Sequence, residues 1–270
     1  MGTSNSNQGQ KGGTPLVPSW LDDDGTNGDI EPEDRPIPPL GDNERFRIPR
    51  GDFTKYVNSS GRNGTYLHKA VNGYVNNSLG GAKNATSRLG AAKASSGRLI
   101  SIFNGISNSG LNSTLEEHGL GTLIGRSVNE IFIGIVDFIC PDGGSTDEGI
   151  ARSSFIETLS ILDELGITDI DEMNENQFLT LTETYISNVI QARLINDIGN
   201  KSINLPDDIG TVDAIQNQIG AFIQGAVCDA IVQLDMSIRN ITPEETRNIV
   251  EKIYETSYTI LGSIYDGSEG

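Results

Sequence analysis

Apolar residues recur at helical spacing along much of the chain, whereas the alternation typical of strands is nearly absent. Two such runs fall between residues 66 and 106, and four more follow between residues 155 and 261. Because an α-helix repeats every ~3.6 residues, the members of each run share one face. The pattern predicts an all-α fold, a helical bundle of about six helices. The runs are Tyr66, Leu67, Ala70, Val71, Tyr74 and Val75; Leu99, Ile102, Phe103 and Ile106; Phe155, Ile156, Leu159, Leu162 and Leu165; Phe178, Leu181, Tyr185 and Val189; Ile215, Ile219, Phe222, Ile223, Ala226, Val227, Ile231 and Leu234; and Ile249, Ile253, Tyr254, Tyr258 and Leu261.

Four short motifs predict where helices begin. The motifs "STLE" (113–116), "SVNE" (127–130) and "STDE" (145–148) each place a glutamate three residues after a serine. In this capping box the hydroxyl and the carboxylate satisfy each other's backbone N–H groups. The fourth motif, "TPEE" (242–245), adds Pro243 at the first helical position, where proline is favoured.

Composition divides the chain into three segments. Residues 1–50 are acidic and proline-rich and have no periodicity, which predicts a long disordered N-terminal tail with an end-to-end distance of about 35–40 Å. Residues 51–112 are predicted to form a basic, Gly/Ala-rich helical segment, weakly stable because each interior glycine costs ~1 kcal/mol relative to alanine. Residues 113–265 are predicted to form an acidic helical bundle domain.

The net charge of −18 is unevenly distributed over the chain. Residues 1–44 carry a net charge of −7, residues 45–115 carry +9, and residues 116–270 carry −20. Such asymmetry indicates that the segments contact different partners, or each other.

The two cysteines, Cys140 and Cys228, both lie in apolar stretches, so we predict reduced, buried thiols. The strongest apolar run, Ile131–Cys140, contains Asp137 and is far shorter than the ~20 residues that a transmembrane helix needs. The first residues lack the apolar stretch of a signal peptide. We therefore expect a soluble, cytoplasmic protein.

The segment "CPDGGSTDEG" (140–149) groups one thiol with three carboxylates: Cys140, Asp142, Asp147 and Glu148. Such a group could bind a metal or perform acid–base chemistry. The same letters also fit a helix end, because a proline and two glycines break the chain before Ser145 caps the next helix. We favour the helix end.

The remaining sequence offers no recognisable catalytic motif. Neither His68 nor His118 has a serine, cysteine or carboxylate at a catalytic spacing, although a triad can be assembled from distant residues. Neither a P-loop nor a dinucleotide-binding motif is present. We predict that the protein is not an enzyme and has no cofactor and no metal.

Lys83, Arg88, Lys93 and Arg98 recur every five residues within the basic segment. On one helix, five residues turn by about 140°, so these cations would wind around the axis instead of forming the single stripe that reads phosphates. The adjacent acidic residues 116–270 would also repel nucleic acid. We expect these residues to contact an acidic protein partner, and nucleic-acid contact is the alternative.

The first residues, "MGTSNS", fit the pattern of N-myristoylation, but one acyl chain on an acidic tail binds anionic membranes weakly. A small second residue also allows removal of Met1, which leaves the α-amine of Gly2 with a pKa of about 7.7–8.0 and no Cβ beside it. Thr3, Ser4, Asn5 and Ser6 are slim enough to follow that amine into a narrow pocket. An ordinary disordered start fits the same residues.

Several motifs occur in a fixed order: "MGTS" at the start, "TPLVPSW" in the tail, the basic block, "CPDGG..DEGIAR" (140–152), "ARLINDIG" (192–199) and "LPDDI" (205–209). Together they resemble the QatB family of the bacterial Qat anti-phage defence system, over essentially the whole chain. The resemblance implies that the protein works with an ATPase, a QueC-like enzyme (QatC type) and a TatD-like nuclease.

QueC enzymes use ATP to activate a deazaguanine carboxylate, which ammonia then attacks. The resemblance implies that the amine of Gly2 replaces ammonia here, with Thr3 and Ser4 recognised by the enzyme. We expect the small residues Asn5 and Ser6 to belong to the same recognition segment. Our hypothesis is therefore a non-catalytic defence component that is conjugated to a deazaguanine at Gly2. The alternatives are an assembly scaffold that links the other components, or a subunit that contacts nucleic acid.

Overall fold

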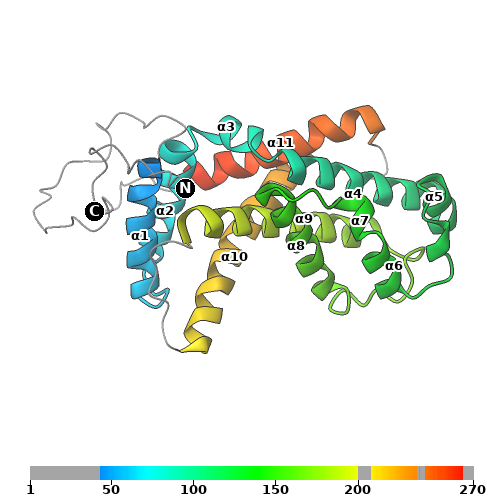
Figure 1. Cartoon of the computed structure of the whole chain (residues 1–270), viewed down its shortest axis with the longest axis horizontal. Helices are drawn as coiled ribbons and strands as arrows, with labels where there is room; N and C mark the ends of the chain where they lie inside the picture. Colours follow the sequence, from blue (N-terminus) through cyan, green and yellow to red (C-terminus); the bar gives the residue numbers. More distant parts are fainter. Residues whose placement is uncertain (1–42, 200–207, 236, 238–240, 264–270) are drawn as a thin grey trace, which may run out of the picture. The chain divides into compact units, whose positions relative to one another are not determined.

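The structure, a computed structural model, describes residues 43–199, 208–235, 237 and 241–263. These residues are helical with no strand among them, which confirms the predicted all-α fold (Figure 1). Six of the eleven described α-helices have twelve residues or more, and five of these six contain all or part of one of the predicted apolar runs; the run Tyr66–Val75 lies in a shorter helix and the turn after it. The six long helices are α1 (Arg47–Asn58), α4 (Gly90–Ser109), α8 (Thr146–Thr158), α9 (Glu175–Leu194), α10 (Ile209–Gln233) and α11 (Pro243–Ser263).

Shorter helices and single turns connect these six. The shorter helices are α2 (Gly64–Gly73), α3 (Ala82–Ser87), α5 (Leu111–Glu117), α6 (Val128–Gly134) and α7 (Val136–Ile139). Three 3₁₀ turns are η2 (Asn43–Phe46), η4 (Gly121–Leu123) and η5 (Leu159–Ile161), and two π-helical turns are η3 (Tyr74–Ser78) and η6 (Ile195–Gly199).

Helical structure begins at Asn43, within the predicted tail of residues 1–50, so the predicted end of the tail is several residues too late. The 3₁₀ turn η2 leads into α1 at Arg47, and the side chains of Phe46 and Pro49 are buried. Pro49 is tolerated because the first turn of a helix has no intrahelical hydrogen bond for its missing N–H to break. The rest of the predicted tail, residues 1–42, lies outside the described residues.

A hydrophobic core joins helices from both predicted helical segments, 51–112 and 113–265. Figure 1 shows α11 running beside α3 and α4, and α4 also contacts α8 and α9. At the centre of this packing the ring of Phe103 lies 4.7 Å from that of Phe178 and 6.5 Å from that of Phe132, centroid to centroid. The weak Gly/Ala-rich helices are therefore held mainly by tertiary packing.

Three of the four predicted helix starts are confirmed. Reciprocal capping boxes form between Ser127 and Glu130 at α6 and between Ser145 and Glu148 at α8. At α11, which begins at Pro243, Thr242 and Glu245 make the same pair of hydrogen bonds, at 2.9 and 3.3 Å.

The predicted start at "STLE" is wrong, because Ser113 lies inside α5. That helix begins at Leu111, directly after Gly110, whose φ of 83° ends α4. The Leu111 N–H donates to the Asp171 carboxylate at 2.7 Å, so the cap comes from a residue 60 positions away. A motif confined to four residues could not reveal such a partner.

Of the two cysteines, Cys140 is buried as predicted, but Cys228 is exposed, so its predicted burial is wrong. Although Cys228 belongs to an apolar stretch, α10 packs only one of its faces against the core. Its buried residues are Ile215, Ile219, Ile223, Ala226, Val227, Ala230 and Ile231. Cys228 and Val232, which is 71% exposed, point away from that face.

We predict that the thiol reagent DTNB labels one cysteine of the native protein and both cysteines after unfolding. The Glu183 carboxylate, together with partial burial and Asp229, raises the pKa of the Cys228 thiol, so less thiolate forms at neutral pH. Native labelling should therefore accelerate as the pH rises above 7, and Glu183→Gln should accelerate it at pH 7. Cys228→Ser should abolish native labelling, and labelling that persists in this variant would show that Cys140 is accessible.

Candidate functional site

The segment between α7 and α8 is a helix end followed by a cap, which confirms the interpretation favoured from the sequence. Helix α7 ends at Ile139, and Ser145 caps α8. The Arg152 guanidinium fixes the connection: it donates to the Cys140 carbonyl at 3.0 Å and pairs with Asp137 at 2.7 Å. Among the residues that the structure describes, no group of three or more His, Cys, Asp and Glu side chains is placed to bind a metal.

Asp147, in the first turn of α8, also caps a different helix. Its Oδ2 accepts a hydrogen bond from the backbone N–H of Ala91 at 2.7 Å, in the first turn of α4. Leu89, which precedes α4, provides no side-chain cap. A carboxylate in this position satisfies a free N–H group and complements the positive end of the helix dipole. Asp147 therefore joins the starts of α4 and α8.

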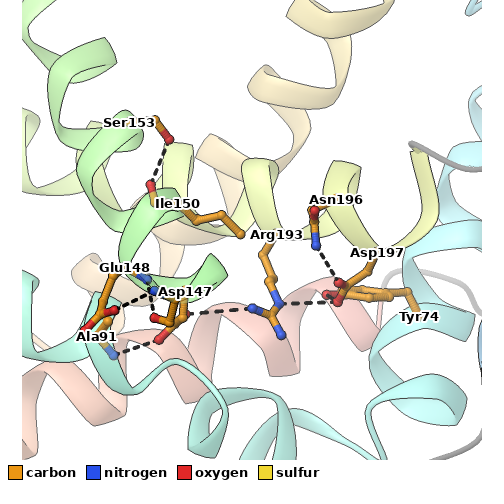
Figure 2. Close-up of polar contacts among 10 residues, drawn as sticks. Tyr74, Ala91, Asp147, Glu148, Ile150, Ser153, Arg193, Asn196 and Asp197 are labelled. Atoms are coloured by element: carbon orange, nitrogen blue, oxygen red, sulfur yellow. Dashed lines mark hydrogen bonds and ion pairs between the residues drawn. The ribbon is translucent and has the colours of Figure 1, made fainter. Parts of the chain in front are cut away.

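A chain of polar side chains continues from Asp147 through the protein interior (Figure 2). The Arg193 guanidinium lies between two carboxylates: Nη1 is 3.8 Å from Asp147 Oδ1, and Nε is 3.4 Å from Asp197 Oδ2. The Tyr74 hydroxyl donates to the same Asp197 oxygen at 2.9 Å, and Asn196 donates to the other at 3.2 Å. The side chains of Asp147, Arg193 and Asp197 are only 12–21% exposed. We call Asp147, Arg193, Asp197 and Tyr74 the polar chain.

Two π-helical turns hold Tyr74 and Asp197 at one end of the polar chain. Tyr74 begins η3 and Asp197 lies in η6, and the hydrogen bond between their side chains joins the two turns. The Asp197 carbonyl also accepts two hydrogen bonds from Arg50, at 2.8 and 3.2 Å. Single π turns are uncommon and frequently occur at functional positions. Here they link α1 and α2 to the end of α9.

Burial and charge together fix the protonation of these groups. Burial lowers the pKa of Arg193, but Asp197, Tyr74 and Asp147 raise it, and the result is a pKa above the ordinary value. Burial raises the pKa of Tyr74 well above its usual range, and the nearby Tyr258 and Asp197 raise it further. The arginine therefore stays charged and the tyrosine stays protonated at neutral pH. The ion pairs and the tyrosine hydrogen bond of the polar chain thus persist at this pH and connect the helices.

The buried thiol beside this region is a poor nucleophile. Burial raises the pKa of Cys140, although hydrogen bonds with Ser95 and Tyr185 oppose the increase. A thiol in such surroundings stays protonated at neutral pH. The two histidines contact aromatic rings instead: His68 stacks on Phe222 and His118 lies against Phe138, each with ring centroids 4.9 Å apart.

The four basic residues singled out in the sequence do not lie on one helix, because the chain breaks between α3 and α4. Lys83 is exposed on α3, and Arg88 directly follows α3 with its pKa lowered by burial. On α4, Lys93 Nζ is 3.9 Å from Glu251, and Arg98 donates to the Ile139 carbonyl at 2.9 Å. Their contacts with partners or phosphates remain a prediction. Gly2, Thr3, Ser4, Asn5 and Ser6 lie outside the described residues.

Two hollows flank the exposed side of α4. One, of about 370 Å³, lies between α4 and the start of α8 and is lined by Cys140, Asp147 and Glu148 among others. The other, of about 570 Å³, lies between α4 and α11 and is lined by Lys93, Arg98 and residues of α11. One signal for this region is visible in the sequence: Arg193 and Asp197 are four residues apart, a spacing at which oppositely charged side chains on a helix can pair. Nothing in the sequence connected them to Asp147 or Tyr74.

A comparison with protein families matches residues 80–261 to the family described as Qat anti-phage system associated protein QatB. The matched residues include α4, α8 and α9 and all members of the polar chain except Tyr74. No curated protein and no solved structure matches the chain.

We predict that Arg193→Met lowers the free energy of unfolding by about 2–3 kcal/mol, because it leaves two poorly exposed carboxylates without their cation. The matched control is Arg126→Met, which removes an ion pair with Glu130 whose side chains are 60% and 56% exposed. That change should cost less than about 0.5 kcal/mol. Urea denaturation measures both values, and equal losses would contradict the assigned role of Arg193.

Proposed function

The chain belongs to the QatB family of Qat anti-phage system associated proteins, and from this premise we propose that it is the protein substrate of its defence system. In this proposal Met1 is removed, and the α-amine of Gly2 accepts a deazaguanine from a QueC-like, ATP-dependent enzyme of the QatC type. The helical residues form a non-catalytic body that docks on the partner. The observation that carries the proposal is the family membership together with glycine at position 2.

The chemistry requires an accessible, unprotonated amine. An α-amino group has a pKa of about 7.7–8.0, so a substantial fraction is a free base near neutral pH. The Gly2 nitrogen would attack the carbonyl carbon of the activated deazaguanine carboxylate. The C–N bond of an amide forms, the bond between that carbon and the activating group breaks, and the nitrogen loses a proton. Glycine leaves this nitrogen unhindered because it has no Cβ.

The arrangement of the helical body supports a substrate role. Forty residues lie between Gly2 and Asn43, where the first described turn begins, which gives the amine enough chain to reach into another protein. Within the described residues, the buried Cys140 thiol has a raised pKa, and the Asp147 and Asp197 carboxylates already serve as helix cap and ion-pair partners. These groups therefore favour a structural use over catalysis.

Basic residues of the helical body are the proposed contacts with the partner protein. Lys83, Arg88, Lys93 and Arg98 lie in the segment that carries +9, so we propose that they contact an acidic surface of a partner protein. The ATPase and the TatD-like nuclease of the system are further candidate partners. None of the described helices is both long and apolar enough to cross a membrane.

The decisive measurement is the intact mass of the protein after co-expression with its QueC-like partner and a supply of deazaguanine. We expect the mass of the Met-free chain plus the deazaguanine acyl group. Gly2→Val places a branched Cβ beside the amine and should abolish the added mass and protection against phage. Gly9→Val makes the same change in the same tail, away from the amine, and should retain both.

An unmodified Met-free mass in the presence of active partner and substrate would contradict the proposal. Deletion of residues 2–6 distinguishes the conjugation substrate from the scaffold alternative. A scaffold would still protect bacteria without these residues, whereas a conjugation substrate would not.

A further inference from the structure

The larger hollow is a groove between α4, α11 and the ends of two short helices. Its floor is a stripe of small residues along one face of α4. The stripe consists of Gly90, Ala94, Gly97 and Ser101, whose spacing of four, three and four residues places them on the same side of the helix. Thr246, Arg247, Val250 and Glu251 of α11 form one wall, and His118 and Phe138 complete the lining. We call this hollow the α4 groove. Its volume of about 570 Å³ is in the range of small-molecule sites.

Three cations and one carboxylate line the α4 groove. Arg98 uses one nitrogen on the Ile139 carbonyl, and its guanidinium keeps further N–H donors. Lys93 lies 3.9 Å from Glu251, beyond hydrogen-bond distance. Arg247 is exposed and makes no ion pair or hydrogen bond with any residue that the structure describes. The groove therefore has an excess of positive charge and free donors.

An aromatic surface lies in the same groove. The rings of His118 and Phe138 are both partly buried, and their centroids lie 4.9 Å apart at an interplanar angle of 51°. Aromatic rings prefer offset-stacked or edge-to-face contacts, so the face or edge of either ring is a possible contact for a third planar ring. The combination of cations, aromatic rings and a floor of small residues favours a ligand that joins a planar ring to a negatively charged group.

We propose that the α4 groove binds a nucleoside phosphate. The phosphates contact Arg247, Lys93 and Arg98, and the base packs against Phe138 and His118 above the small residues of α4. An acidic peptide would match the charges but would not require the aromatic rings. This site is independent of Gly2, so it can be tested on the purified protein without the conjugating enzyme.

The test is isothermal titration of the full-length protein with ATP and, separately, with inorganic pyrophosphate. We expect ATP to bind, and Arg247→Ala to weaken its binding at least about tenfold, because charge-assisted hydrogen bonds are lost. Lys252→Ala is the matched control, since Lys252 is exposed on the same helix but does not line the groove. This control should bind ATP like the unaltered protein.

The role of the aromatic rings in binding the base is tested by substituting Phe138 and His118. Phe138→Leu should weaken ATP binding about threefold or more and leave pyrophosphate binding unchanged. His118→Leu should do the same, and it replaces Phe138→Leu as the test if that variant does not fold. The proposal is overturned if ATP does not bind at about 1 mM, if pyrophosphate binds as tightly as ATP, or if Arg247→Ala binds ATP like Lys252→Ala.

Discussion

The placement of the Arg193 guanidinium between the carboxylates of Asp147 and Asp197 is the interaction on which the arrangement of helices depends. Charges with so little exposure are costly unless they are paired, so each carboxylate must remain within reach of the arginine. Asp147 in turn caps α4, and Asp197 holds Tyr74. One guanidinium thereby connects α2, α4, α8 and α9 through these side chains.

This constraint matters most for the Gly/Ala-rich helices, which have little intrinsic stability. Helix α4 obtains its N-terminal cap from Asp147, and its Arg98 side chain binds the Ile139 carbonyl. Its buried face packs against α8, α9 and α11. The small residues on its remaining face are not needed for the core. They leave the α4 groove open, so the same composition that weakens the helix also creates the groove.

The proposed functions use different parts of the molecule. Conjugation requires only the first residues and a body that can dock on the enzyme, whereas nucleotide binding requires the α4 groove. Lys93 and Arg98 belong both to the basic segment and to the groove lining. A nucleoside phosphate held there would neutralise part of the positive charge proposed to attract an acidic partner. Membership of the QatB family places both proposals in the context of anti-phage defence.

Sequence patterns alone were enough to predict the all-α fold, the starts of α6, α8 and α11, and the burial of Cys140. These features depend on residues within about one helical turn or on the apolar period of a helix, so a linear pattern contains them. The sequence also provided the Gly2 hypothesis, which concerns residues outside the described fold.

Four features became visible only in the folded protein: the start of α5, the exposure of Cys228, the polar chain and the α4 groove. Asp171 caps Leu111 from 60 positions away, and Asp147 caps Ala91 from 56. Cys228 is exposed because α10 buries one face and not the other. Each of these features depends on which helices pack against each other, and short-range spacing does not encode that choice.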